Sequence, residues 1–163
     1  MGQALQSAAR SDIYDADSYE PGKGMGHLIG RLRGELLAAL DRELSSDERL
    51  APLEVTAAQL IIIARLAEGG AAKSSSVLCK GISYDAGAMT RMVDRLESKG
   101  LIRRERCPND RRVVYLELTE EGRATYPRMR EVSRTVMNRF LRGFTAAEAR
   151  QLESLLLRML QNA

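Results

Sequence analysis

Apolar residues recur at helical spacing in the first and last parts of the chain. The T-A-A-E run at 145–148 is a capping box that predicts a last helix over 146–161. Thr119 is placed to cap a helix over 120–142, and Glu120 and Glu121 are favourable in its first turn. An earlier apolar stripe predicts a long first helix over about 22–46: Met25, Leu28, Ile29, Leu32, Leu36, Leu40 and Leu44.

The middle of the chain alternates shorter helices with strands. The pattern predicts a helix over 57–68, a break at Gly69-Gly70 and a short helix near 74–80. Asp85 is a good N-cap for a helix over 86–99, which Gly100 is placed to end. That helix has an apolar stripe of Met89, Met92, Val93 and Leu96.

Two β-rich runs follow this helix, 101–106 and 113–118. The turn formers and cations of 108–112 lie between them. A helix followed by such a hairpin is the order of a winged helix, which lays the helix in the DNA major groove with the hairpin beside it.

Particular side chains of this segment suit DNA. The first turn of the helix is small enough to approach another surface closely, and the basic residues behind it, which include Lys99, suit phosphates. Arginines at the hairpin tip suit the narrow minor groove, where Asp110 is expected to orient Arg112. Ser74, Ser75 and Ser76 either donate to phosphate or only cap the short helix. The expected DNA contacts are Ala86, Gly87, Ala88, Thr90, Arg91 and Arg95 in the helix, and Asp110, Arg111 and Arg112 in the wing.

Composition and charge agree with a DNA-binding domain. The chain has 163 residues, 44% of them apolar, and a net charge of +3. The charge is uneven, because residues 71–115 hold ten Lys or Arg against five Asp or Glu. No apolar run is long enough to span a membrane and the N-terminus lacks a signal-peptide pattern, so a cytoplasmic protein is expected. One histidine and no H-E-x-x-H, G-x-S-x-G or Walker-type loop argue against an enzyme, and neither a metal nor a cofactor is expected.

The motifs of this segment resemble those of the MarR regulators. The family pattern D-x-G-A-x-T-R-M-x-D-R-L-x-x-K-G corresponds to residues 85–100, its N-D-x-R wing to 109–112, and its L-T-x-x-G to 118–122. The T-A-A-Q run at 56–59 is similar to the start of the family's second helix. The resemblance extends over about residues 24–162 and leaves out the first twenty. It implies a regulator that binds double-stranded DNA and is released by phenolic or aromatic carboxylic acids.

The first and last two helices hold more apolar surface than a small winged domain can cover. They either pack on one another or, as we expect, bury this surface in a symmetric homodimer. The resemblance implies the same dimer, which would bind a pseudo-palindrome with half-sites ~34 Å apart. The expected fold is mainly α (α+β), a winged helix-turn-helix domain with a small β-hairpin wing between dimerisation helices. Its parts are a polar arm at 1–20, a first helix and connector at 21–54, the winged domain at 55–119 and closing helices at 120–163.

Two pairs of residues are candidates for binding a small anionic aromatic ligand. His27 is one helical turn before Arg31, and the pair either meets a carboxylate or is structural. In the protein after which the family is named, a bound aromatic acid lies beside the positions that match Thr90 and Arg104, so this pair is the second candidate.

Two alternatives stay open. Some family members sense peroxide through a cysteine near the start of the first helix, and this chain has none there. Its cysteines, Cys79 and Cys107, fit no C-x-x-C pattern, but a redox-responsive regulator using either one is an alternative. The other alternative is a winged-helix module that binds only proteins. We expect a DNA-binding transcriptional regulator, a repressor released by an aromatic acid.

Overall fold

The computed structural model describes residues 12–15, 17–69, 73–74, 84–106 and 113–163. The chain divides into two compact units, Met1–Gly34 and Glu35–Ala163. Helix α1 (Met25–Ser46) begins in the first unit and ends in the second. It starts three residues later than predicted. In the first unit, the rings of Tyr14 and Tyr19 meet edge to face with centroids 5.4 Å apart.

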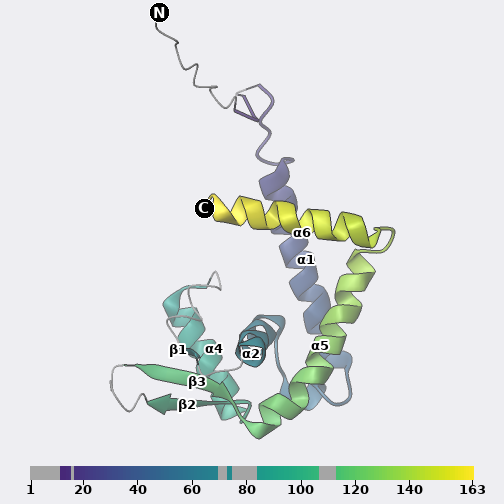
Figure 1. Ribbon diagram of the computed structural model, residues 1–163. Coiled ribbons are helices and arrows are strands. Elements are labelled where there is room, and N and C mark those ends of the chain that lie inside the picture. The colour runs from purple at the N-terminus through teal and green to yellow at the C-terminus, as the bar shows by residue number, and fades with distance from the viewer. Residues whose placement is uncertain (1–11, 16, 70–72, 75–83, 107–112) are drawn as a thin grey trace, which may run out of the picture. The chain divides into compact units, whose positions relative to one another are not determined.

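The second unit contains the winged domain and the closing helices. After α1 come a short 3₁₀ helix, η1 (Ala51–Leu53), and α2 (Ala57–Glu68). Strand β1 (Lys73–Ser74), helix α4 (Ala86–Ser98) and strands β2 (Ile102–Arg106) and β3 (Val114–Leu118) follow. Helices α5 (Glu120–Phe140) and α6 (Ala146–Gln161) end the chain (Figure 1).

The described strands form a three-stranded antiparallel sheet in the order β1-β3-β2. Strands β2 and β3 are the predicted hairpin, and their register pairs Arg104 with Leu116. Strand β1 was not predicted as a strand, because two residues are too few for an alternating pattern. The prediction of a helix from about residue 74 is therefore wrong at Ser74, which pairs with Tyr115 of β3; residues 75–80 lie outside the described part of the chain.

Helix α2 begins where its capping residues dictate. The Gln59 amide nitrogen donates to Thr56 Oγ1 at 3.3 Å, and the Thr56 amide nitrogen donates to Gln59 Oε1 at 3.1 Å. Asp41 of α1 adds a tertiary cap, because its Oδ1 accepts from the Ala57 amide nitrogen at 2.6 Å. All three bonds satisfy groups that a helix N-terminus otherwise leaves unpaired. Helix α2 is thereby attached to the C-terminal half of α1.

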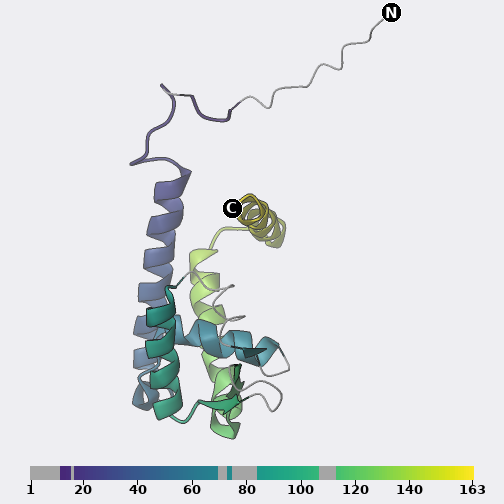
Figure 2. The ribbon, with the colours of Figure 1, turned by 90° about the vertical axis from the view of Figure 1, so that its left-hand side faces the viewer.

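The hydrophobic core lies where α2, α4, α5 and the sheet meet (Figure 2). The predicted stripe of α4 faces this core, since Met89, Val93 and Leu96 are buried. The largest fully buried side chains of the second unit come from α1, α2, α4, α5, strands β2 and β3 and the connectors between these elements: Leu44, Leu50, Ile62, Ile63, Leu96, Leu101, Ile102, Leu116, Met129 and Val136.

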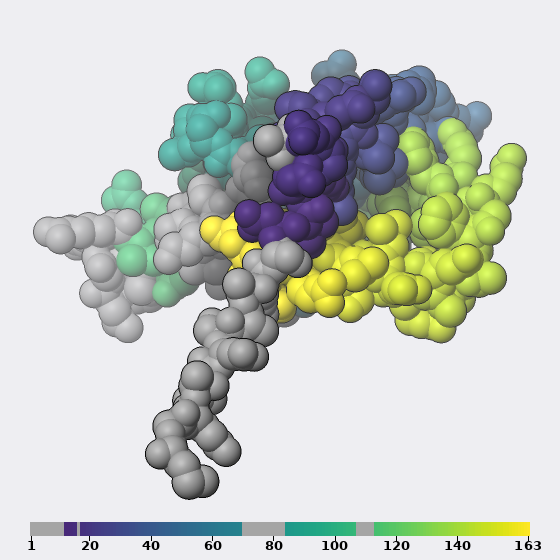
Figure 3. Space-filling view, turned by 90° about the horizontal axis from the view of Figure 1, so that it is seen from above, coloured from purple at the N-terminus to yellow at the C-terminus, as the bar shows by residue number. Residues whose placement is uncertain are grey.

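Helix α6 contrasts with this core. Thr145 and Glu148 form the predicted capping box, and the helix spans the residues expected of it. None of its residues is buried by the described part of the chain. Leu155, Leu157 and Leu160 are 42%, 60% and 72% exposed. The space-filling view shows this helix (yellow) at the surface (Figure 3). Among the described residues, no helix is long and apolar enough to cross a membrane.

Candidate nucleic-acid interface

Helix α4 presents a small and basic face to solvent. Asp85 caps it, with Oδ1 accepting from the Ala88 amide nitrogen at 2.8 Å. That hydrogen bond is the main reason why the pKa of Asp85 lies below its usual value. Met89, Val93 and Leu96 are buried, and the opposite face is exposed. The exposed residues on it include Ala86, Gly87, Thr90, Arg91 and Arg95; Ala88 is half-buried.

The side chain of Thr90 is held by its own helix. Its Oγ1 donates to the Ala86 carbonyl oxygen at 2.8 Å, and the hydroxyl oxygen can still accept a hydrogen bond. Lys99 differs from Arg91 and Arg95, although it too was expected to suit phosphates. Its ammonium group donates to the carbonyl oxygens of Leu53 at 2.5 Å and Glu54 at 3.1 Å. Lys99 therefore attaches the end of α4 to the connector before α2.

The start of α5 is packed against the end of α4. Gly100, which ends α4 with a φ of +69°, has the left-handed conformation predicted for it. Its carbonyl oxygen accepts from Thr119 Oγ1 at 2.6 Å, and Thr119 Oγ1 also caps α5 by accepting from the Gly122 amide nitrogen at 3.0 Å. A Cβ atom on Gly122 would lie 2.1 Å from the Leu101 carbonyl oxygen. The glycine of the L-T-x-x-G motif is thus required by this close approach.

Strand β2 is joined to α4 by two ion pairs. Arg104 Nη2 lies 2.5 Å from Asp94 Oδ1, and Arg104 Nη1 donates to Glu97 Oε2. Partial burial opposes the charge on Arg104, but the hydrogen bond to Asp94 and the charge of Glu97 outweigh it and raise the pKa of Arg104. The neighbouring Arg103 pairs instead within the sheet, with Glu117 at 2.9 Å and Glu105 at 3.0 Å. The acidic partners of Arg104 were not predicted from the sequence.

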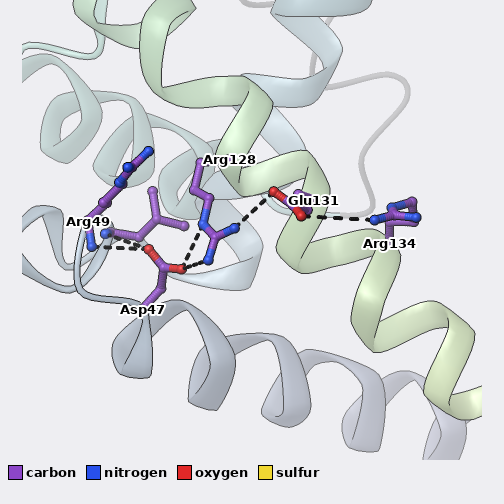
Figure 4. Close-up of polar contacts among 6 residues, drawn as sticks. Asp47, Arg49, Arg128, Glu131 and Arg134 are labelled. Atoms are coloured by element: carbon purple, nitrogen blue, oxygen red, sulfur yellow. Dashed lines mark hydrogen bonds and ion pairs between the residues drawn. The ribbon is translucent and has the colours of Figure 1, made fainter.

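A second polar cluster joins the α1–α2 connector to α5 (Figure 4). Asp47 Oδ2 accepts from Arg128 Nε at 2.8 Å and lies 2.6 Å from Arg128 Nη2. Asp47 Oδ1 accepts from the Arg49 amide nitrogen at 3.1 Å, and Arg128 also donates to Glu131 at 2.9 Å. The Asp47 side chain is only 8% exposed. The sequence carried no local signal for this cluster, because Asp47 and Arg128 are 81 positions apart.

Several candidate residues lie outside the described part of the chain. They are Ser75, Ser76, Cys79, Cys107, Asp110, Arg111 and Arg112; of Ser74 only the backbone is described. His27 and Arg31 are exposed residues of α1 in the first unit. Thr90 and Arg104 belong to the second unit, where an anion at Arg104 would compete with Asp94 and Glu97.

Comparison with known proteins identifies the family. The model of the MarR family matches residues 55–114. The apo form of MarR from Escherichia coli is 33% identical, with a TM-score of 0.66, over 84% of this chain and 96% of that one. A mutant of the same protein complexed with operator DNA is 34% identical, with a TM-score of 0.71, over 83% and 92%.

A more distant structure has the same fold. It is BpsR of Bordetella bronchiseptica, whose DNA binding is regulated by 6-hydroxynicotinic acid. It is 24% identical, with a TM-score of 0.69, over 89% of this chain and 98% of that one. The motifs of α4, the hairpin that follows it and the identity to MarR over most of the chain agree: the chain belongs to the MarR family of DNA-binding transcriptional regulators.

Proposed function

We propose that this regulator is a homodimeric repressor that binds a pseudo-palindromic operator and is released by a small aromatic acid. The observation that carries the proposal is the solvent-facing side of α4, where small residues and two arginines are exposed on a helix whose opposite side is buried. A helix of this kind enters the major groove with its N-terminal residues at the base edges. Arg91 and Arg95 would then contact phosphates.

The wing supplies the second set of contacts in this proposal. Arg111 and Arg112 follow β2, so a wing beside α4 would bring them to the minor groove next to the bases that α4 contacts. Asp110 would orient Arg112. Ser74, Ser75 and Ser76 are proposed phosphate contacts before α4. The operator complex of the E. coli relative, at 34% identity, supports DNA as the partner.

Homodimerisation is supported by the uncovered helices. Helix α6 exposes Leu155, Leu157 and Leu160, and the first half of α1 exposes Met25 and Leu28. A soluble protein seldom leaves so many large apolar side chains exposed unless a partner covers them. A two-fold dimer would cover these faces and set two copies of α4 about one turn of DNA apart.

The ligand is proposed by analogy with BpsR. The acid that regulates BpsR, 6-hydroxynicotinic acid, is a small aromatic acid. Either the pair His27 and Arg31 or the pair Thr90 and Arg104 is proposed to bind such an anion here. Release requires that the acid bind more tightly to a dimer whose α4 helices are wrongly spaced for DNA. A redox-responsive regulator that uses Cys79 or Cys107 is the alternative.

The test is a fluorescence anisotropy titration on the promoter DNA next to the protein's own gene. Benzoate, salicylate and 6-hydroxynicotinate are added as competitors, with and without a prior peroxide treatment. Tight binding that one acid reverses supports the proposal, and His27→Ala should then keep DNA affinity but respond less to the acid. Release by peroxide alone would favour the cysteines.

A further inference from the structure

The recognition helix α4 carries two acidic residues on the part nearest the wing. Asp94 and Glu97 lie within the same stretch as Arg91 and Arg95, and their side chains are 55% and 39% exposed. Carboxylates beside a DNA-binding face repel phosphate unless a cation is paired with them. Arg104 of β2 is paired with both, so its charge is used inside the protein and is not free for DNA.

The geometry of these two ion pairs fixes the orientation of the Arg104 guanidinium and also neutralises its charge. Nη1 and Nη2 of one guanidinium meet carboxylates that are three residues apart, that is, on neighbouring positions of one helix face. A planar guanidinium with two separate partners has little freedom to rotate. We call the contact of Arg104 with Asp94 and Glu97 the Arg104 bridge. It holds the start of the wing to α4 in addition to the buried contacts of Ile102.

The Arg104 bridge contributes little to folding. All three side chains are about one-third exposed or more, and exposed ion pairs are weak because water and salt screen them. The fold of the winged domain rests instead on its buried core. The bridge joins β2 to α4, and the wing arginines follow β2 in the sequence.

We propose that Arg104 is a positioning residue for DNA binding. It holds the wing in a fixed orientation relative to α4, so that the wing and α4 reach adjacent grooves of the DNA. Arg104 itself makes no contact with DNA. Arg103 is the matched control that the chain provides. It lies next to Arg104 on the same strand and has the same charge, but its partners Glu117 and Glu105 lie in the sheet.

The first test compares Arg104→Ala with Arg103→Ala in operator titrations over a range of salt concentrations. Arg104→Ala should weaken operator binding by at least about fivefold, the lower end for one lost base contact. Arg103→Ala should have a much smaller effect. Because Arg104 acts through the wing, Arg104→Ala should not reduce the slope of log affinity against log salt any further in a chain that already carries Arg111→Ala and Arg112→Ala. A further reduction by about one in that chain would make Arg104 a phosphate ligand and overturn the proposal.

Two further variants separate orientation from charge. Arg104→Lys keeps the positive charge but cannot pair with both acids through a rigid plane, so it should recover little of the lost affinity. Full recovery with lysine would overturn the proposal. In a chain that carries Asp94→Ala and Glu97→Ala, removing Arg104 as well should cause no further loss. If Arg104→Ala lowers operator affinity as much in that chain as it does in the wild-type background, Arg104 acts without its bridge.

Hydrogen exchange tests the orientation without DNA. Amide exchange in 102–106 and 114–118 should quicken in Arg104→Ala, while α2 and α5 keep their protection. Unchanged exchange in both strands would overturn the proposal. Faster exchange throughout the second unit would mean that Arg104 stabilises the whole fold and does not position the wing, which would overturn it as well. The affinity tests rest on the proposed operator binding, but the exchange test does not. If the wild type binds no operator, the proposed function fails. The exchange result then still shows whether Arg104 holds strands β2 and β3 in place.

Discussion

Replacement of Gly122 by alanine probes the contact that joins the start of α5 to the end of α4. The new methyl carbon would lie 2.1 Å from the Leu101 carbonyl oxygen, 3.1 Å from the Leu101 carbonyl carbon and 3.3 Å from Leu118 Cδ2. Normal contact requires a movement of about 1 Å. The obstructing atoms are backbone, so a side-chain rotation cannot supply that movement, and α5 must shift away from Leu101.

The expected cost follows from opposing effects. Overpacking of this size destabilises a protein by about 1–3 kcal/mol. A shift of α5 also weakens the Thr119 cap, which contributes about 1 kcal/mol. Alanine is a better helix former than glycine by about 1 kcal/mol, which offsets part of this loss. The net loss of about 1–3 kcal/mol should lower Tm by about 2–4 °C for each kcal/mol.

The assay is thermal unfolding followed by circular dichroism, with all variants at one concentration because the Tm of a dimer depends on concentration. Glu121→Ala is the control, since Glu121 is exposed in the same helical turn and already has a Cβ atom. Its Tm should stay within about 2 °C of the wild type. A Gly122→Ala variant as stable as the wild type would refute the close approach of α5 to Leu101.

Other predictions concern the caps, the Asp47 cluster and the DNA face. Thr56→Ala removes the α2 capping box and should cost about 1 kcal/mol, measured by urea unfolding. The hydrogen bond from Arg128 is the main cause that holds the pKa of Asp47 below its usual 3.8. The ionised Asp47 carboxylate therefore stabilises the fold at neutral pH, and this stabilisation is lost as pH falls below about 4. Asp47→Asn should accordingly lose less stability than the wild type on acidification, and equal losses in the two proteins would contradict this. Arg95→Ala should reduce the salt slope of operator binding by about one, whereas Arg142→Ala, after the far end of α5, should leave it unchanged (Figure 1).

Local patterns predicted the helices and the hairpin well. Short-range chemistry decides where helices begin, so the caps at Asp85, Thr119 and Thr145 marked their starts correctly. The start of α2 at the T-A-A-Q run came from the family resemblance, and the structure shows that Thr56 caps it. The apolar stripe of α4 identified its buried face because a helix has one period throughout. Strand β1 escaped prediction because its two residues are defined by their partners in β3.

The polar contacts between elements were beyond sequence reasoning. Side chains alternate along a strand, which separates Arg104 from Arg103, but nothing local showed that Asp94 and Glu97, ten and seven positions before Arg104, face it. Lys99 was expected to suit phosphates, yet it donates to carbonyl oxygens 45 and 46 positions away. Such pairs depend on how elements pack, which a single sequence does not record.

The measurement that tests the central claim most directly is the ratio of affinities for the promoter DNA and for a shuffled sequence of equal length and composition. Both titrations are made at the same near-physiological salt concentration, since electrostatic binding varies steeply with salt. A regulator whose α4 reads base edges should prefer the promoter DNA by at least about 10³-fold. Equal, weak affinity for the two sequences would contradict the account and favour a winged domain that binds other proteins.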